Sequence, residues 1–212
     1  MKFVKFASSL VILASTVFAL TGQAHAGSLT IQPLREELEL RPGQTVTNKL
    51  TIRNTSAIEQ KVTLKAENFS IINENYDYHF ADAGYLEKWV RFDTKQITLQ
   101  PGLSKTVTYT IGAPAETEPG GRYIALFATV DGQVVSDDVK TVERAGLLLY
   151  ITVPGQISKK GTVIDIKTPL LTSKRNLDWQ LRIRSSGTAH FKNRTTLKVR
   201  TIFGKTVTEY TD

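Results

Sequence analysis

The chain of 212 residues contains no cysteine, so no disulfide bond can hold it together. Its stability must therefore come from a hydrophobic core, for which 41% hydrophobic residues is adequate. An exported chain without cysteine is common in Gram-positive-type bacteria. The absence argues against a small, disulfide-stapled secreted scaffold.

Histidine is almost as scarce, with three residues at positions 25, 79 and 190. The sequence has no H-E-x-x-H motif and no calcium-loop spacing, so we expect no metal site and no cofactor. It also has no G-x-S-x-G motif and no Walker-type loop. With no catalytic constellation, we expect a protein that is not an enzyme.

The acidic cluster Glu36, Glu37 and Glu39 is the nearest approach to an acid–base pair. In a strand, Glu36 would share the inward face with Leu38 and the next leucine, while Glu37 and Glu39 would point to solvent. These carboxylates are therefore expected to be structural or solvated residues.

Long apolar runs are confined to the beginning of the chain. Lys2 and Lys5 precede an apolar run over about 6–20, and Ala24-His25-Ala26 then places small residues at −3 and −1. This is the layout of a secretory signal peptide, so residues 1–26 are predicted to be removed after Ala26. We expect an exported protein on the extracellular face of a bacterial cell envelope.

The next most apolar run, Ala145–Val153, is too short to span a membrane and predicts a buried strand. Removing Lys2 and Lys5 lowers the net charge from +7 to +5, and basic residues gather over 159–200. The positive charge indicates either a solvated basic face or attraction to an anionic envelope. Nucleic acid is not an expected partner of an exported chain.

Alternation of apolar and polar residues dominates the remaining 186 residues (212 − 26) and predicts an all-β fold. Turn residues separate short strands, a pattern typical of an immunoglobulin-like β-sandwich. The expected strands lie at about 29–33, 36–40, 45–53, 60–68, 88–92, 95–99, 104–111, 121–130 and 145–153. The polar segment 132–142 is expected to be a loop.

Two Pro-Gly dipeptides, at 42–43 and 101–102, lie 59 residues apart, and each follows the pattern Leu-x-Pro-Gly. Each is a type II turn signal before a threonine-rich strand. They predict two equivalent corners of one sandwich over 28–153. A second immunoglobulin-like unit is expected to start at 155–212, with strands at about 161–168, 178–185, 195–202 and 205–210. Its 58 residues are too few for a whole domain, so we expect a fragment.

The series Trp89-x-x-Phe92, Leu99-x-Pro101-Gly102 and Pro119-Gly120-Gly121-x-Tyr123 resembles the immunoglobulin-like domain of Gram-positive WxL-interacting surface proteins. The resemblance covers about residues 29–153. It implies a peptidoglycan-binding first domain, then a partner-binding second domain and a C-terminal membrane anchor. Membrane association would depend on that anchor, which this sequence does not contain.

The same segment is also similar to the N-terminal domain of periplasmic pilus chaperones. Those proteins hold a subunit's terminal carboxylate with paired basic residues and offer it an edge strand. Arg35 and Arg122 are the basic residues near suitable strands here. The resemblance alone does not assign the pair.

An aromatic-rich stretch, 69–89, is the candidate ligand site, and its proposed binding residues are Tyr76, Tyr78, Phe80 and Tyr85. Exposed rings beside Asn and Asp side chains can stack on sugars and hydrogen-bond their hydroxyl groups. Alternatively, the rings cover the end of the sandwich core. The sequence therefore predicts a non-catalytic binding or scaffold protein for peptidoglycan or a surface partner. The alternative is a periplasmic or extracellular assembly chaperone that acts by β-strand addition.

Overall fold

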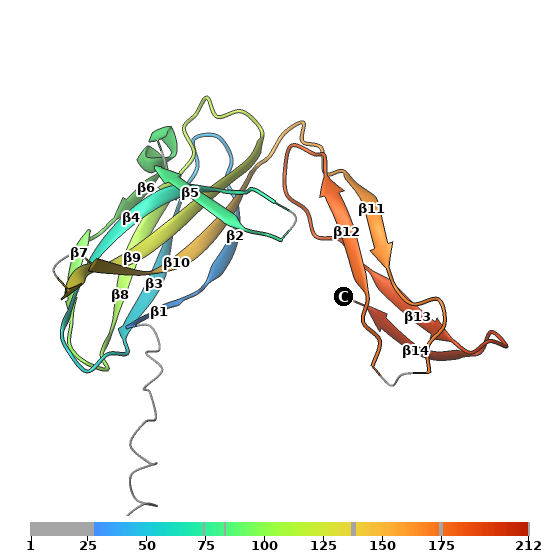
Figure 1. Ribbon diagram of the computed structural model, residues 1–212. Coiled ribbons are helices and arrows are strands. Elements are labelled where there is room, and N and C mark those ends of the chain that lie inside the picture. Colours follow the sequence, from blue (N-terminus) through green and yellow to red (C-terminus); the bar gives the residue numbers. More distant parts are fainter. Residues whose placement is uncertain (1–27, 74, 83, 137–138, 174–175, 212) are drawn as a thin grey trace, which may run out of the picture.

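The computed structural model describes residues 28–211 except 74, 83, 137–138 and 174–175. The predicted signal peptide lies outside these residues. Ten strands form the first unit, from β1 (Leu29–Gln32) to β10 (Val139–Val153), and four form the second (Figure 1). The all-β sandwich expected from the alternating pattern is confirmed. Within the described residues, no helix is long and apolar enough to cross a membrane.

Two sheets make up the first unit. The smaller has the order β1-β3-β8-β6, where β3 is Thr45–Asn54, β8 is Ser104–Gly112 and β6 is Val90–Phe92. The larger has the order β2-β10-β9-β4-β5, and β7 (Gln96–Leu99) also pairs with β4. In it, β2 is Arg35–Glu39, β9 is Gly120–Ser136, β4 is Gln60–Ile71 and β5 is Tyr78–Asp82.

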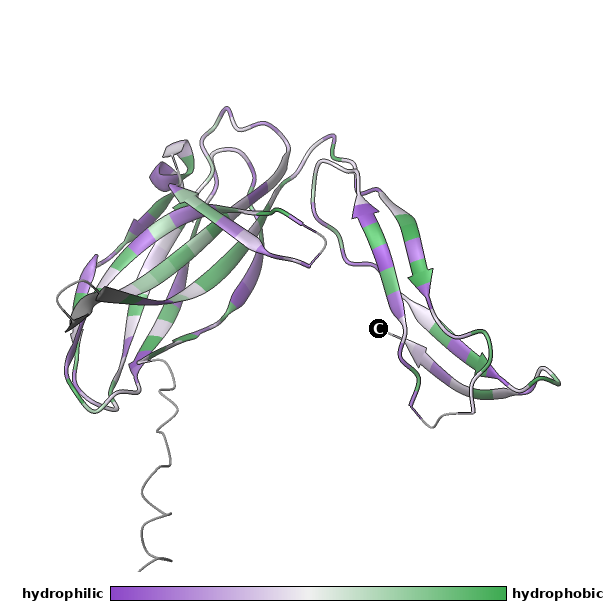
Figure 2. Ribbon diagram, in the orientation of Figure 1, coloured by the Kyte–Doolittle hydropathy of each residue, from purple (hydrophilic) through white to green (hydrophobic). Residues whose placement is uncertain are grey.

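The core lies between the two sheets because each strand turns every second side chain inward. Leu50 and Ile52 of β3 meet Leu149 and Ile151 of β10 in one cluster, and all four are fully buried. Full burial of such a side chain stabilises the fold by about 1.5–3 kcal/mol. Trp89 joins the same cluster. Figure 2 shows the alternation of apolar and polar positions along these strands.

The two Pro-Gly turns have matching geometry. Gly43 and Gly102 have φ of 78° and 71°, the left-handed conformation that a type II turn requires. Gln44 N donates to Arg41 O at 2.9 Å, and Leu103 N donates to Gln100 O at 3.1 Å. The prediction of two equivalent corners is confirmed.

Two predictions about connections were wrong. Within the polar segment 132–142, the described residues 132–136 and 139–142 are strand and not loop, because β9 continues to Ser136 and β10 begins at Val139. Strands β9 and β10 pair from Gly120 opposite Val153 to Ser136 opposite Val139. Their backbone hydrogen bonds therefore outweigh the polar composition of the segment. The strand expected at 88–92 is shorter, because the 3₁₀ helix η2 (Gly84–Trp89) precedes β6.

The second unit consists of two antiparallel pairs. Strand β11 (Gly161–Lys167) pairs with β12 (Gln180–Ser185), and β13 (Thr196–Arg200) pairs with β14 (Thr206–Thr211). Among its described residues, Ala189 is the only apolar one that is buried. Leu170, Phe203 and other large apolar side chains are exposed. The domain boundary near 154 and the incompleteness of this unit stay predictions.

Candidate functional site

The larger sheet has a second apolar cluster on its outer face, away from the core. Because the odd-numbered residues 147–153 of β10 fill the core, Tyr150 points outward. It packs with Phe127 of β9 and Phe69 of β4, and these side chains are 3–6% exposed. Both faces of the central strands are therefore covered, which explains why they are apolar almost throughout.

Edge-to-face contacts order the rings of this aromatic cluster. The Phe69 ring lies 5.3 Å from that of Tyr150 at 73°, and 5.7 Å from that of Tyr78 at 75°. Phe80 meets Phe127 at 4.9 Å and 80°. Such pairs contribute about 0.5–1.5 kcal/mol each beyond area burial, so the outer face is a packed surface.

The segment Thr188–Lys192 of the second unit lies against this face. Gly121 N donates to Thr188 O at 2.9 Å, and the His190 ring lies 5.4 Å from Tyr150 and 5.7 Å from Tyr123. Burial lowers the pKa of His190 below its usual 6.5, so its imidazole is neutral at pH 7. Thr188 and His190 thus connect this segment to β9 and β10.

A cavity of about 430 Å³ lies between the aromatic cluster and this segment. It combines apolar and aromatic walls with a few polar groups, the usual makeup of a binding pocket. Its lining includes Arg35, Phe69, Tyr76, Tyr123, Tyr150, Ile183, His190 and Phe191.

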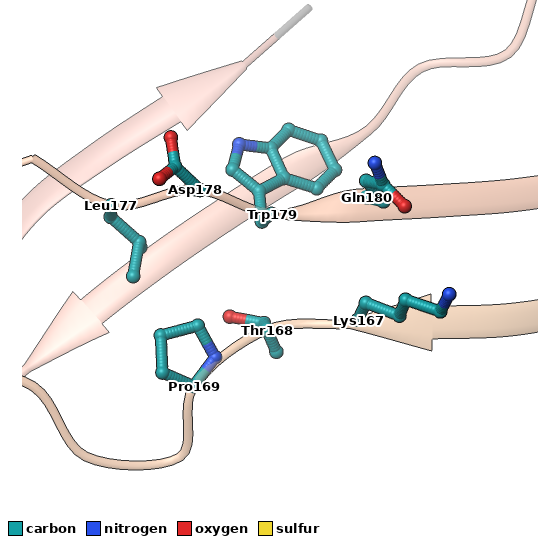
Figure 3. A pocket seen from close by; sticks show the side chains of 7 residues that line it. All are labelled: Lys167, Thr168, Pro169, Leu177, Asp178, Trp179 and Gln180. Atoms are coloured by element: carbon teal, nitrogen blue, oxygen red, sulfur yellow. The ribbon is translucent and has the colours of Figure 1, made fainter.

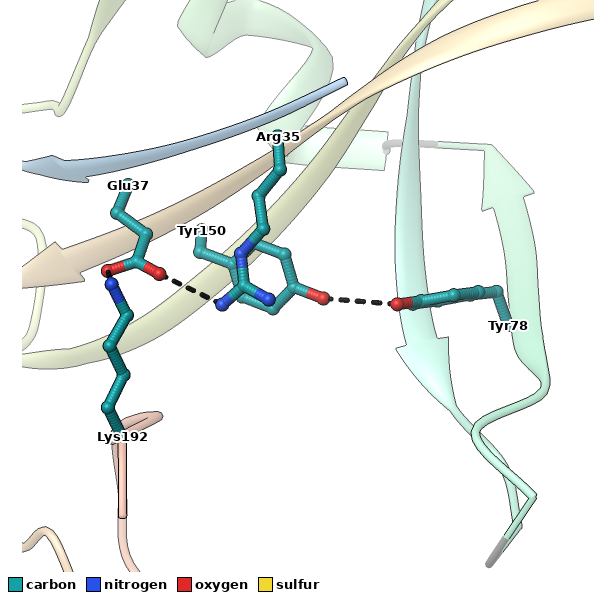
Figure 4. Close-up of polar contacts among 5 residues, drawn as sticks. All are labelled: Arg35, Glu37, Tyr78, Tyr150 and Lys192. Atoms are coloured by element: carbon teal, nitrogen blue, oxygen red, sulfur yellow. Dashed lines mark hydrogen bonds and ion pairs between the residues drawn. The ribbon is translucent and has the colours of Figure 1, made fainter. Parts of the chain in front are cut away.

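Arg35 is the cation of this cavity, and Figure 4 shows its contacts. Its guanidinium lies 4.0 Å from the centre of the Tyr150 ring, and its Nη2 lies 2.9 Å from Glu37 Oε1. Lys192 Nζ lies 3.0 Å from Glu37 Oε2, so one carboxylate bridges cations of both units. Lys192 first, and then Arg35, holds the pKa of Glu37 below its usual range against the opposing effect of burial.

Tyr150 also carries a polar contact, since its hydroxyl lies 3.4 Å from that of Tyr78. Burial, followed by this hydrogen bond, raises the pKa of Tyr150 well above 10. Tyr150 therefore stays a neutral phenol, which supports Arg35 with its ring and Tyr78 with its hydroxyl.

Strand β10 is paired unequally along its two sides. Its inner side pairs with β9 along nearly its whole length. On its other side β2 pairs in parallel only with Leu148–Thr152. In the part of the chain that the structure describes, no strand pairs with Val142–Leu147 on that side. This stretch is the free edge of β10.

Backbone groups on the free edge point away from β9. Leu148 N donates to Leu34 O at 3.0 Å on the side of β10 opposite β9. The even-numbered residues of β10 therefore direct their backbone N–H and C=O groups toward that side. The N–H and C=O groups of Arg144 and Gly146 therefore face the same way. Strand β1 lies beside this region but pairs with β3, and its Leu29 N donates to the Glu143 carboxylate at 3.3 Å.

The structure separates the four aromatic residues proposed from the sequence. Tyr76 lines the cavity and is 67% exposed, while Tyr78 and Phe80 pack together on the outer face with rings 6.1 Å apart. Tyr85 belongs to η2 and does not line the cavity. Tyr78 and Phe80 thus pack on the outer face of the larger sheet, whereas the alternative interpretation expected the rings to cover the end of the sandwich core. Their role in ligand binding stays a prediction.

Sequence reasoning missed Tyr123, Tyr150, Glu37 and Lys192. The two tyrosines lie in apolar strands, where nothing marks an outward-facing ring. The alternation of inward and outward positions could have identified the two tyrosines, because every second side chain of a strand points to the outer face even when both faces are apolar. Arg122, the second basic candidate, donates to the backbone carbonyls of Gly121 and Glu118 at 2.9 and 3.1 Å.

A separate hollow of about 800 Å³ lies in the second unit (Figure 3). Its side chains come from the end of β11 and the approach to β12, and Trp179 and Lys167 are the largest among them. It is open to solvent and has no buried charged group. Among the described residues, no group of three His, Asp or Glu side chains could hold a metal ion.

No protein-family model matches the chain, and no curated protein matches it. Among solved structures, the class 5 fimbrial chaperone CfaA aligns at 9% identity over 87% of this chain and 97% of its own, with a TM-score of 0.45. The Escherichia coli chaperone DraB aligns at 13% identity, 88% and 98% coverage, and a TM-score of 0.42.

A chaperone–tip adhesin complex of CFA/I fimbriae aligns at 11% identity, over 82% of this chain and 74% of that chain, with a TM-score of 0.46. These structures belong to the second of the two classes that the sequence resembles, the pilus chaperones. At such identities and TM-scores they carry no argument about function. The WxL-interacting resemblance and its peptidoglycan-binding function stay predictions.

Proposed function

We propose that the protein binds an extended segment of another exported protein by β-strand addition to the free edge of β10. The observation that carries this proposal is the unequal pairing of β10. Arg144 and Gly146 direct backbone donors and acceptors outward where β2 no longer covers the strand. An added strand would satisfy these groups and extend the sheet, which is the general basis of β-augmentation.

The electrostatics of the edge select a direction for the added strand. Arg35 is the first residue of β2 and pairs with Leu148, so it stands where the free edge ends. A segment parallel to β10 would lie in line with β2 and bring its carboxyl end to Arg35. An antiparallel segment would bring its amino end there, and like charges would oppose it. We therefore expect a parallel strand whose terminal carboxylate contacts Arg35.

Glycan binding, the first function expected from the sequence, has no observation in its favour. The rings that would carry it are distributed between a packed cluster and η2, and of the four only Tyr76 lines the cavity. It stays a prediction.

The test uses a set of acetylated peptides of about nine residues, a usual strand length, that alternate apolar and polar positions. Each is made with a free carboxyl end and with an amide end, and binding to the full chain is measured by calorimetry. Members of the set should bind, with the carboxylate form about two- to fivefold tighter, as expected for an exposed ion pair. Absence of binding by every peptide would contradict the proposal.

A further inference from the structure

The side chain of Glu36 reaches across the sandwich to the smaller sheet. It lies on the inner face of β2, where Asn48 Nδ2 donates to its Oε1 at 2.7 Å and the Tyr109 hydroxyl donates to its Oε2. Asn48 and Tyr109 stand opposite each other on β3 and β8. These three residues, the Glu36 cluster, attach β2 to a point outside its own hydrogen-bond ladder.

The two donors of the Glu36 cluster lie between the sheets. Tyr109 is fully buried and Asn48 is partly buried. Burial, and then the bond to Glu36, raises the pKa of Tyr109 well above 10, so the phenol keeps its proton and stays a donor. If Glu36 moved along its strand, the Tyr109 hydroxyl would lose this acceptor inside the core, which costs free energy.

The other contacts of β2 repeat every two residues. Its parallel hydrogen bonds with β10 are evenly spaced, so a shift by two residues preserves the ladder and keeps each side chain on its face. In one direction, the shift would put Leu34 in the place of Glu36. It would also put Leu38 in the place of the fully buried Leu40. Leu34 is 68% exposed, so it would gain burial as Leu40 lost it.

The shift in the opposite direction meets a specific obstacle. It would place Pro42 where Leu40 now donates its N–H to Thr152 O at 3.0 Å. Proline has no N–H, so the ladder would lose this bond. The competing register is therefore the one that brings Leu34 inward.

We propose that the Glu36 cluster fixes the register of β2 on β10, which makes Glu36 a positioning residue for strand addition. A single buried polar residue specifies register in coiled coils in the same way, because its partners are available in one alignment. The consequence for binding rests on the proposed function. In the competing register Arg35 would stand opposite Tyr150 instead of Leu148, and the free edge of β10 would be two residues longer.

The experiment uses disulfide formation to report the register, since the chain has no cysteine of its own. Thr152→Cys with Glu39→Cys tests the observed register, in which these residues are opposite each other. Thr152→Cys with Glu37→Cys tests the competing one. Cysteines with Cα atoms more than about 7 Å apart cannot be bridged, which keeps the two pairs distinct. Each full chain is oxidised without peptide, and the disulfide yield is measured by mass spectrometry.

The Glu36 cluster predicts that the observed pair forms about tenfold more than the competing pair. Glu36→Leu should raise the ratio of competing to observed pair about tenfold, because leucine fits both registers. Glu36→Gln should keep the observed register, since its amide oxygen still accepts from Tyr109. The control is Thr51→Val with Thr106→Val, which removes a hydroxyl pair 3.1 Å apart between the same strands β3 and β8. It should change neither yield.

An apolar variant of the whole cluster keeps the test decisive if Glu36→Leu alone does not fold. It combines Glu36→Leu, Asn48→Leu and Tyr109→Phe. Apolar replacement of a buried polar cluster is often neutral or stabilising, so Tm should fall by no more than about 3 °C. The competing pair should still gain about tenfold. A role in stability alone predicts the reverse, a lower Tm with the register unchanged.

The outcomes separate this inference from the proposed function. A competing pair that stays rare in both Glu36→Leu and the apolar variant would overturn the register role, while strand addition at the free edge of β10 would stand. If the register changes as expected but no peptide binds at that edge, strand addition fails and the register role stands.

Discussion

Arg35 and Leu148 are paired in register at the point where β2 stops covering β10. Beyond this pair the edge of β10 is free, and the Arg35 guanidinium lies where the free edge ends. The same position therefore combines an incomplete hydrogen-bond ladder with a fixed positive charge.

Loss of the Arg35 charge is expected to weaken the binding of carboxylate-ended peptides and to leave the binding of amide-ended peptides nearly unaffected. Arg35→Gln should cost about two- to fivefold in carboxylate affinity. Arg35→Lys should lose less carboxylate affinity than Arg35→Gln but still lose some, because lysine keeps the charge but lacks the planar fork that stacks on Tyr150. Calorimetry with both peptide forms checks this. Arg91→Gln, an exposed arginine on β6 of the other sheet, is the control and should change neither affinity.

Asn54 is expected to be important for the stability of the first unit. Fully buried, it donates to Ile58 O at 2.7 Å and Leu99 O at 3.0 Å, and Ser56 N donates to its Oδ1 at 2.9 Å. Asn54→Ala leaves these buried groups without hydrogen-bond partners. It should lower the free energy of unfolding by about 1–3 kcal/mol, measured by urea denaturation.

Asn73→Ala is the matched control for Asn54→Ala. Asn73 makes a similar set of local bonds, accepting from Asn75 N and Asp77 N, but on the exposed surface. It should cost about 0.5 kcal/mol or less. Equal losses in the two variants would show that burial of the Asn54 amide is not what matters.

His190 should make stability fall as the pH is lowered from about 6.5. Burial is the main cause that lowers its pKa; Lys159, Arg35 and Lys192 act in the same direction and Glu37 opposes them. In the unfolded chain the imidazole takes up a proton at about pH 6.5, before the folded chain does, so acid favours unfolding. The stabilisation is complete above pH 6.5 and is lost as the pH falls towards the folded pKa.

Thermal unfolding between pH 7.5 and 5 checks this dependence, and an NMR titration of the imidazole gives its folded pKa directly. His190→Gln removes the group and should flatten the profile over that range. A profile that is unchanged in His190→Gln would contradict the assignment to this histidine.

Local sequence patterns predicted the sandwich because each pattern has a single structural meaning. Alternation at Val107, Tyr109 and Ile111 places all three in the core, where they are fully buried. The Pro-Gly turns likewise require a positive φ at Gly43 and Gly102, and the structure has it. Both features depend only on neighbouring residues.

Features that depend on pairing between distant segments could not be predicted in the same way. The described residues of the polar stretch 132–142 are strand because β9 and β10 pair along it. The bridge from Glu37 to Lys192 joins residues that are 155 positions apart (192 − 37). Glu37 was correctly expected on the exposed face of its strand, but nothing local indicates which cations face it.

The most direct test of strand addition is hydrogen exchange at the free edge of β10. The amides of Arg144 and Gly146 are measured in the full chain, alone and with a saturating carboxylate-ended peptide from the set above. Strand addition predicts that both amides become protected, while the amides of β5 and β7, at other edges, keep their rates. Peptide binding that leaves Arg144 and Gly146 unprotected would contradict it.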